Sequence, residues 1–297
     1  MKMNWKLTIC TAAALAGIAF MSGCGGSEKD AQSTAASGKK TIVAATEGMV
    51  RPVSYVDKDG NLTGYEVAVL KAIGQELGYN IKFEKTEFTS MFAGVNSGRY
   101  QVGFGNLSKT AKRQEQFAFT SISHYYEPAG FFVTHGLLEK HPIHKIEDLG
   151  GLKTDTNSKG DSWQRFIEAF NAKFPDNPIK ATYSDEDWGA YYKRLNSGEI
   201  DVIKGAESRT KIYSDEYGYH FDFVSLPQSE LDRANGLAAP EQWFVFRKTK
   251  DGEALAAEFD KAITKLRDNG TLSKLSIEYL GRDYSSKANY EKDHQKS

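Results

Sequence analysis

Residues 41–285 alternate between two hydrophobic patterns, one typical of strands and the other of helices. "TIVAAT" at 41–46 is a short apolar run with β-branched residues, which predicts a buried strand. "YEVAVLKAIGQELG" at 65–78 has apolar residues every three or four positions and ends at a glycine, which predicts an amphipathic helix. "NIKFEKT" at 80–86 follows as the next predicted strand. This alternation predicts an α/β fold with mixed, mostly parallel sheets flanked by helices.

One phrase occurs twice, as "VNSGRYQVGFG" at 95–105 and "LNSGEIDVIKG" at 195–205. In each copy a predicted helix (88–96 and 188–196) runs into Asn-Ser-Gly, and a short strand that begins with valine follows. Glycine readily takes the left-handed conformation that ends many helices, because it has no Cβ. Asn-Ser-Gly is also a common helix stop, so coincidence remains the alternative. A true repeat predicts two similar α/β lobes.

The C-terminal part of the chain reads as two helices. Within 253–281, apolar residues lie on one helical face, and Asn269-Gly270 separates a first helix from a second that runs from 271 to 279. The following residues, 286–297, are polar and are predicted to be an unstructured tail.

The N-terminus has the pattern of a secretory signal. Lys2 and Lys6 precede an apolar stretch at 7–21, which is too short to span a membrane. "MSGC" at 21–24 resembles a bacterial lipobox, which predicts removal of residues 1–23 and a lipid anchor on Cys24. The alternative is an ordinary signal cleavage that leaves Cys24 unmodified. Residues 24–40 are rich in Gly, Ser and Ala and are predicted to be a flexible tether.

Composition narrows the class of protein further. The chain has 38 basic and 39 acidic residues with no cluster of either sign, so nothing indicates nucleic-acid binding. It has two cysteines, one of them in the signal, which leaves no disulfide framework. His135, His141 and His144 lie near one another in sequence without a carboxylate or thiol constellation, so we expect no metal site. No cofactor is expected, and we expect a monomer.

Several stretches of the sequence resemble those of a known protein family. "FTSMFAGVNSGRYQVGFGNLSKTAKRQEQFAF" at 88–119 is similar to the first-lobe signature of type II periplasmic binding proteins for polar amino acids, the substrate-capturing lipoproteins of ABC importers. "YVDKDGNLTGYEVAVLKAI" resembles the early helix of that family. "SMFAGVNSG" and "EYLGRDYS" most resemble the cystine-binding branch.

The resemblance implies a two-lobe clamp of the periplasmic-binding-protein type II class. Lobe 1 would comprise 41–127 and 239–285, and lobe 2 would comprise 128–238, with the ligand in the cleft between them. It also implies a lipid-anchored protein on the extracellular or periplasmic side of the membrane, which delivers its ligand to the transmembrane subunits of an ABC permease.

The family pattern places three kinds of ligand contact in lobe 1. Arg113 of "SKTAKR" would hold the α-carboxylate, because a guanidinium makes two parallel hydrogen bonds to it. The alternative is a solvated arginine beside Lys112. Ser108 and the carbonyl groups near Asn106 are candidates for the ammonium group. Phe88 is expected to pack on the ligand, unless it is a core aromatic.

In lobe 2 the sequence matches the family's pattern of ligand-contacting residues less closely. Gly160, Asp161 and Ser162 precede a predicted helix, whose free N–H groups would attract an anion. Asp161 itself would repel a carboxylate, and ordinary helix capping is the alternative. The family often has an aspartate at the position of Ala206, so Glu207 would meet the ammonium if the strand bulges; otherwise it is a surface acid.

Glu47 and Arg51 follow the first predicted strand, at a position that contacts the distal end of the ligand in this family. A carboxylate and a guanidinium together would suit a second zwitterionic end, such as that of cystine. The sequence therefore predicts a binding protein for cystine or a similar polar amino acid, and not an enzyme. An enzyme of the cyclohexadienyl-dehydratase type on the same scaffold and a ligand-sensing lipoprotein remain as alternatives.

Overall fold

The computed structural model describes residues 39–127, 129–156, 162–184, 188–234 and 241–294. The predicted signal peptide and Cys24 lie outside these ranges. The described residues belong to one compact unit of helices and sheets.

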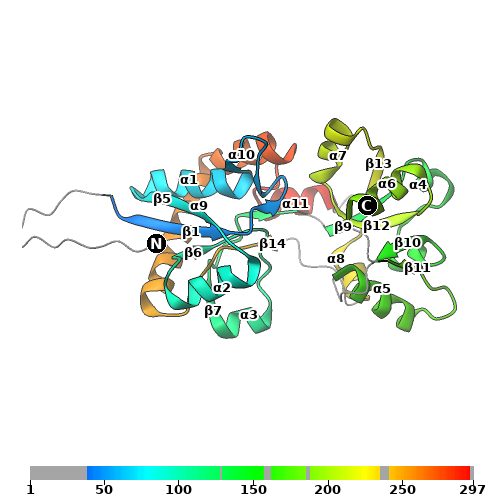
Figure 1. The fold of residues 1–297 in the computed structure, drawn as a ribbon, viewed down its shortest axis with the longest axis horizontal. Helices are drawn as coiled ribbons and strands as arrows, with labels where there is room; N and C mark the ends of the chain where they lie inside the picture. The colour runs from blue at the N-terminus through cyan, green and yellow to red at the C-terminus, as the bar shows by residue number, and fades with distance from the viewer. Residues whose placement is uncertain (1–38, 128, 157–161, 185–187, 235–240, 295–297) are drawn as a thin grey trace, which may run out of the picture. The chain divides into compact units, whose positions relative to one another are not determined.

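The strands and helices of this unit alternate along the chain, as the sequence predicts (Figure 1). The strands are β1 (Thr41–Thr46), β2 (Met49–Val50), β3 (Ser54–Val56), β4 (Leu62–Thr63), β5 (Asn80–Lys85), β6 (Val102–Gly103), β7 (Phe117–Phe119), β8 (Tyr125–Tyr126), β9 (Ala129–Thr134), β10 (Lys153–Thr156), β11 (Lys180–Tyr183), β12 (Val202–Ala206), β13 (Phe221–Ser225), β14 (Glu241–Gln242) and β15 (Val245–Arg247). The helices are α1 (Tyr65–Leu77), α2 (Phe88–Ser97), α3 (Ala111–Gln116), α4 (Leu137–Lys140), the 3₁₀ helix η1 (Ile146–Leu149), α5 (Ser162–Lys173), α6 (Trp188–Ser197), α7 (Arg209–Tyr217), α8 (Gln228–Asp232), α9 (Lys250–Asp268), α10 (Thr271–Leu280) and α11 (Lys287–His294).

The largest sheet has five strands in the order β5-β1-β6-β15-β7. Strand β1 pairs parallel with β5 and β6, whereas β15 pairs antiparallel with β6 and β7. Strand β15 lies far along the chain from the other four, so this sheet is built from two separate parts of the sequence. The chain leaves it through β8 and rejoins it through β14, and these two short strands pair antiparallel.

Alternate residues of β1 belong to two apolar layers on opposite faces of this sheet. Ile42 and Ala44 pack in a buried cluster with side chains of α1, α9 and α10. Ala45 packs in a different cluster with Met91 and Val95 of α2. Successive residues of a strand point to opposite faces of a sheet, so these two clusters lie on opposite faces of this one. Helices therefore cover both sides of the sheet and bury it (Figure 1).

A second group of sheets is built from residues between β8 and β14. Strands β12, β9 and β13 form an antiparallel sheet with β9 in the middle, and β10 pairs parallel with β11. Phe131 of β9 packs with Trp163 of α5, while its neighbour Phe132 packs with Tyr191 of α6. This part of the chain therefore has its own two-sided core.

The repeated sequence phrase forms the same local structure twice. Helix α2 ends before Gly98 and β6 follows; helix α6 ends before Gly198 and β12 follows. The two glycines have φ angles of 82° and 74°, and each donates its N–H to the carbonyl oxygen three residues earlier at 3.1 Å. The predicted unit of helix, glycine cap and strand is thus confirmed in both halves of the chain.

The C-terminal tail differs from its prediction. Residues 287–294 form helix α11 in place of an unstructured tail. The hydroxyl of Ser286 accepts a hydrogen bond from the N–H of Asn289 at 3.1 Å, and Lys287 pairs with Glu291 one turn later at 3.5 Å. A hydroxyl at the start of a helix and an ion pair on its surface both stabilise a polar helix that has little apolar surface to bury.

No helix within the part of the chain that the structure describes is both long and apolar enough to cross a membrane.

Candidate ligand-binding site

Arg113 is positioned by the short segment between β6 and α3. Thr110 caps α3, and its hydroxyl accepts the backbone N–H of Arg113 at 3.3 Å. The guanidinium of Arg113 turns back and donates from Nη1 to the carbonyl oxygen of Ser108 at 2.9 Å. Two of the residues predicted for lobe 1, Arg113 and Ser108, are therefore in direct contact.

This guanidinium lies against a pair of aromatic rings that contact each other. Its central carbon lies 5.6 Å from the ring centre of Phe88 and 5.1 Å from that of Phe92. Phe88 is 37% exposed, so this aromatic faces solvent in part and is not simply a core residue. Burial lowers the pKa of Arg113, and no ion pair reaches it within the described residues. Arg113 is thus a partly buried cation that retains free donors.

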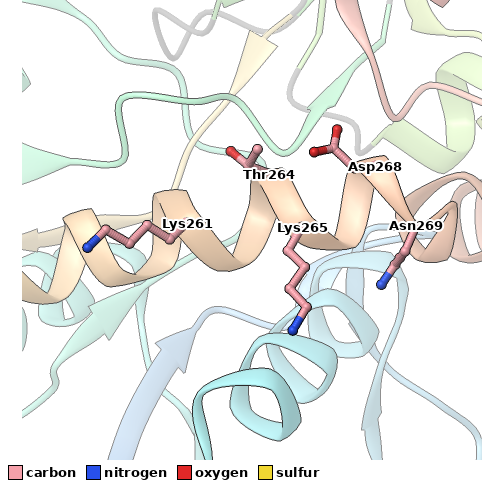
Figure 2. A pocket seen from close by; sticks show the side chains of 5 residues that line it. All are labelled: Lys261, Thr264, Lys265, Asp268 and Asn269. Carbon is pink, nitrogen blue, oxygen red and sulfur yellow. The ribbon is translucent and has the colours of Figure 1, made fainter.

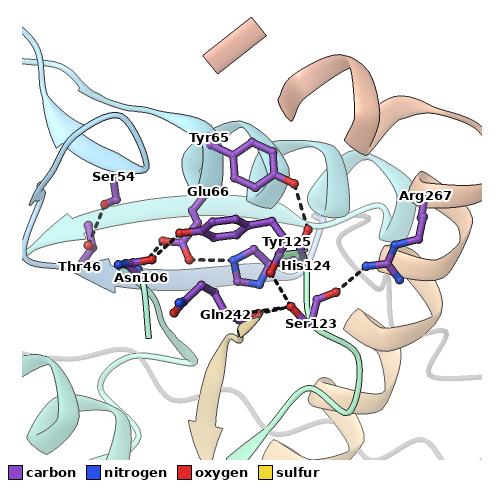
Figure 3. A network of polar contacts seen from close by, with 10 residues as sticks. All are labelled: Thr46, Ser54, Tyr65, Glu66, Asn106, Ser123, His124, Tyr125, Gln242 and Arg267. Carbon is purple, nitrogen blue, oxygen red and sulfur yellow. Dashed lines mark hydrogen bonds and ion pairs between the residues drawn. The ribbon is translucent and has the colours of Figure 1, made fainter. Parts of the chain in front are cut away.

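A buried polar network holds the segment that carries Ser108 (Figure 3). Glu66, near the start of α1, is fully buried; its Oε2 accepts the N–H of Asn106 at 3.1 Å and its Oε1 lies 2.8 Å from Nε2 of His124. The hydroxyl of Tyr125 donates to Oδ1 of Asn106, and that of Tyr65 donates to the carbonyl oxygen of His124 at 3.0 Å.

This network explains the backbone conformation at Asn106. Its φ angle is 58°, in the left-handed region that is uncommon for residues other than glycine. Glu66 and Tyr125 bind the N–H and the side chain of Asn106, which offsets the cost of that conformation. The chain therefore turns at Asn106 and brings Ser108 and Arg113 to the same edge of the sheet.

Glu47 and Arg51 line one pocket with a volume of about 350 Å³. The other lining residues are Met49, Val50, Arg209 and Tyr213. The guanidinium of Arg51 lies over the ring of Tyr55 at 4.5 Å, and its Nη1 pairs with Oε2 of Glu216 at 2.6 Å. The structure therefore brings together the two predicted distal residues, with Arg51 already paired.

The residues predicted for lobe 2 are placed less favourably for contact with a ligand. Both carboxylate oxygens of Glu207 are engaged, one by Arg282 at 2.5 Å and the other by the hydroxyl of Tyr284 at 2.8 Å. Ser162 is the first residue of α5, whereas Gly160 and Asp161 lie outside the described residues. An ammonium contact at Glu207 and an anion contact at the start of α5 remain predictions.

Glu127 is a buried carboxyl beside the start of α7. It is 9% exposed, and its Oε1 accepts the backbone N–H of Ser208 at 2.8 Å. Burial raises the pKa of Glu127, and the hydrogen bond from Ser208 only partly opposes this effect. Nothing in the sequence pattern singled this residue out.

A different hollow runs along helix α9, with a volume of about 530 Å³ (Figure 2). It is lined by Lys261, Thr264, Lys265, Asp268 and Asn269. All of these residues come from α9 and its C-terminal cap, and Lys265 is paired with Glu76. A surface formed by one helix encloses little of a ligand, so this hollow is not the candidate site.

His135, His141 and His144, the three histidines that lie close together in sequence, are all among the described residues. His135 pairs with Asp222 at 2.9 Å, and the described residues contain no group of three or more His, Cys, Asp or Glu side chains placed to hold an ion.

Sequence reasoning missed Arg209, Tyr213 and Phe92. Arg209 is the third residue after β12, so its place at the end of a strand was a usable signal. Phe92 lies one helical turn after Phe88 and therefore on the same face of α2. Tyr213 is recognisable only from the packing of α7 against Glu47 and Arg51.

Comparison with known proteins identifies the family. Residues 42–282 match the model of the bacterial extracellular solute-binding proteins, family 3. The chain belongs to this family. The predicted α/β fold of the type II periplasmic-binding-protein class is thereby confirmed, and membership places the protein on the extracellular or periplasmic side of the membrane. The expectation of mostly parallel sheets is wrong, because most strand pairs among the described residues are antiparallel.

Similar proteins from other bacteria include amino-acid-binding proteins, which is consistent with this family. The L-cystine-binding protein TcyJ of Bacillus subtilis (strain 168) is 27% identical over 256 residues, which cover 85% of this chain and 88% of TcyJ. A probable amino-acid ABC transporter-binding protein of Haemophilus influenzae is 28% identical over 248 residues, which cover 82% and 86%.

A solved structure also resembles this chain. It concerns glutathione import in Gram-positive bacteria via GshT and the cystine ABC importer TcyBC of Streptococcus mutans. The TM-score is 0.66 at 27% identity, and the match covers 84% of this chain and 99% of the other. Together these comparisons make this protein a solute-binding protein of the amino-acid ABC-transporter type.

Replacing Glu66 tests the network that holds Asn106. Glu66→Ala leaves the N–H of Asn106 and a ring nitrogen of His124 buried without a partner. Loss of one partner from a buried charged network typically lowers the free energy of unfolding by about 3–5 kcal/mol. Urea unfolding measures the change. Glu76→Ala, which removes only the exposed pair with Lys265, should cost under about 1 kcal/mol. Equal losses for the two variants would contradict the assignment.

Glu127 should make stability depend on pH. Because its pKa is raised in the folded state, the unfolded chain loses this proton at lower pH than the folded protein does. The free energy of unfolding contributed by Glu127 is therefore fully present in acid and falls as pH rises through the unfolded pKa of about 4.3 towards the folded pKa. Glu127→Gln removes this fall.

The stability of Glu127→Gln relative to wild type should therefore increase from acid to neutral pH in urea unfolding at a series of pH values. Glu115→Gln, at an exposed carboxylate on α3, is the matched control. A difference between Glu127→Gln and wild type that stays constant with pH would disprove the assignment.

Proposed function

We propose that this protein is the membrane-anchored binding component of an ABC importer for cystine or a similar polar amino acid. The observation that carries the proposal is the guanidinium of Arg113, which is partly buried against Phe88 and Phe92 and has no anionic partner among the described residues. Removing a cation from water is unfavourable unless an anion takes the place of its hydration. A ligand carboxylate supplies such an anion and fits the fork of the guanidinium.

The remaining contacts follow from the same geometry. Arg113 uses Nη1 for Ser108, so its other donors are available to a carboxylate. Ser108 and the carbonyl groups near Asn106 lie on the same segment and would accept hydrogen bonds from the ammonium group. Phe88 would cover the apolar part of the ligand, as its partial exposure allows. These assignments together describe an α-amino acid held at the end of strand β6.

Delivery and anchoring complete the proposal. After binding, the protein would present its ligand to the transmembrane subunits of a permease, with a lipid on Cys24 keeping it at the membrane. The relationship to an L-cystine-binding protein favours cystine as the ligand. The relatives that match are binding proteins, which supports a binding role over catalysis.

Calorimetric titration of the purified protein, freed of any bound ligand, tests this function. L-cystine is expected to bind, and Arg113→Ala should weaken its binding by about 30-fold to 5,000-fold, since truncating one partner of a buried charge pair typically costs about 2–5 kcal/mol. Arg113→Lys keeps the charge but not the bidentate geometry, and should fall between wild type and alanine. Lys112→Ala, at an exposed neighbouring cation, should bind as wild type does. The proposal would be abandoned if no amino acid or cystine produced heat, or if Arg113→Ala bound cystine as tightly as Lys112→Ala does.

A further inference from the structure

Glu207 joins parts of the molecule that are far apart in the sequence. It directly follows strand β12 of the second group of sheets, whereas its partners come after helix α10, near the C-terminus. Oε1 of Glu207 pairs with Nη1 of Arg282 at 2.5 Å, and its Oε2 accepts a hydrogen bond from the hydroxyl of Tyr284 at 2.8 Å. Both oxygens of this carboxylate are therefore bound by the segment that follows α10.

Tyr284 is anchored in the core beside the five-stranded sheet. It is 4% exposed and packs in the same apolar cluster as Ile42 of β1. Its backbone N–H donates to the hydroxyl of Ser276 on α10 at 2.8 Å. Burial and the negative charge of Glu207 both raise the pKa of Tyr284, so its hydroxyl keeps the proton that it donates. Tyr284 thus offers a fixed donor to the second group of sheets.

The same segments also bind the crossing between the sheets, at β8 and the residue after it. The N–H of Tyr126 in β8 donates to the carbonyl oxygen of Tyr284 at 2.7 Å. The next residue, Glu127, accepts the N–H of Ser208, which directly follows Glu207, at 2.8 Å. One residue of the crossing is therefore bound to the C-terminal segment, and the next is bound to the turn before α7.

These contacts close a triangle of three segments. The crossing (126–127), the C-terminal segment (282–284) and the turn before α7 (207–208) are each hydrogen-bonded to the other two. The chain leaves the five-stranded sheet through β8 and rejoins it through β14, so a rotation of one group of sheets against the other bends the crossing. Such a rotation also changes the distance between Glu207 and Tyr284, because they belong to different groups.

Helix α7 is held to the five-stranded sheet at both of its ends. It starts two residues after Glu207, and Glu216 near its other end pairs with Arg51, in the turn after β1, at 2.6 Å. That turn and α7 together line the pocket of about 350 Å³ described above. The triangle therefore holds an orientation in which both groups of sheets face one pocket.

We propose that Glu207, Arg282 and Tyr284 form a noncovalent strap that sets the orientation of the two groups of sheets, and with it the fraction of molecules ready to bind a ligand. Glu207 is then a positioning residue, in place of the ammonium contact predicted from the sequence. A protein of which only a fraction is competent binds its ligand more weakly by that fraction. Loss of the strap therefore weakens binding without removing any contact with the ligand.

Substitutions at the three positions separate a strap from a ligand contact, and the affinity measurement rests on the amino-acid-binding function above. Tyr284→Phe keeps the ring in its cluster and should weaken L-cystine binding by about threefold to tenfold in calorimetry, because a hydrogen bond to a carboxylate is lost. Arg282→Gln should have a smaller effect, since this side chain is 46% exposed.

Glu207→Ala removes both contacts and should weaken binding at least as much as Tyr284→Phe does. Adding Tyr284→Phe to Glu207→Ala should change the affinity by less than about twofold, because the two residues act through one interaction. Lys287→Ala removes only an exposed ion pair of the neighbouring helix α11. It is the matched control and should bind as wild type does.

Small-angle X-ray scattering of the protein freed of ligand reads the conformation directly. The radius of gyration of Glu207→Ala and of Tyr284→Phe should exceed that of wild type and of Lys287→Ala, and saturating L-cystine should remove the difference.

Two results would overturn the proposal. Weaker binding in Glu207→Ala, with no change in Tyr284→Phe or Arg282→Gln, would make Glu207 a ligand contact. Scattering of Glu207→Ala and Tyr284→Phe that matches wild type would show that these contacts do not set the orientation. If wild type bound no amino acid, the proposed function would fail, and the scattering comparison would still decide whether the strap exists.

Discussion

The buried carboxylate of Glu66 is the interaction on which the candidate site depends. It joins helix α1 to the backbone of Asn106 and to His124, three segments that are far apart in sequence. A carboxylate with no exposure is tolerated only if its oxygens are bound, and here both are. In return it holds Asn106 in a left-handed turn, and that turn directs the following residues to the edge where strands β1 and β6 end.

Unpaired charges near the candidate site are the physical basis of the proposed ligand binding. Arg113, Arg209 and Glu47 each make no ion pair among the described residues. A zwitterion carries both signs of charge and can satisfy such groups without changing the net charge of the protein. Aromatic rings beside Arg113 lower the local polarity and so strengthen its attraction for a carboxylate.

The fold makes this arrangement possible because parallel strands end at the same edge of a sheet. Parallel pairing of β1 with β5 and β6 brings the segments after these strands to one side, as in other α/β sheets that bind ligands beyond their carboxyl ends. The repeated unit of helix, glycine cap and strand then occurs again at β12, whose end carries Glu207 and Arg209. The segments that lead to Arg113 and to Arg209 thus follow the same kind of local structure.

The sequence by itself determined the helices and strands around the site, including both glycine caps and the boundaries of β1 and α1, because these depend on local periodicity and on residues with special backbone freedom. It also singled out Arg113 and Ser108 through a resemblance to a family. It did not indicate α11, whose stability comes from a cap and an ion pair in a polar segment. Only the tertiary structure decided that Arg51 pairs with Glu216, that Glu207 pairs with Arg282, and that Arg209 stands unpaired beside Glu47. These ion pairs join residues more than 70 positions apart in the sequence. Local sequence patterns do not predict them, because the partner of a long charged side chain depends on which segments lie nearby after folding.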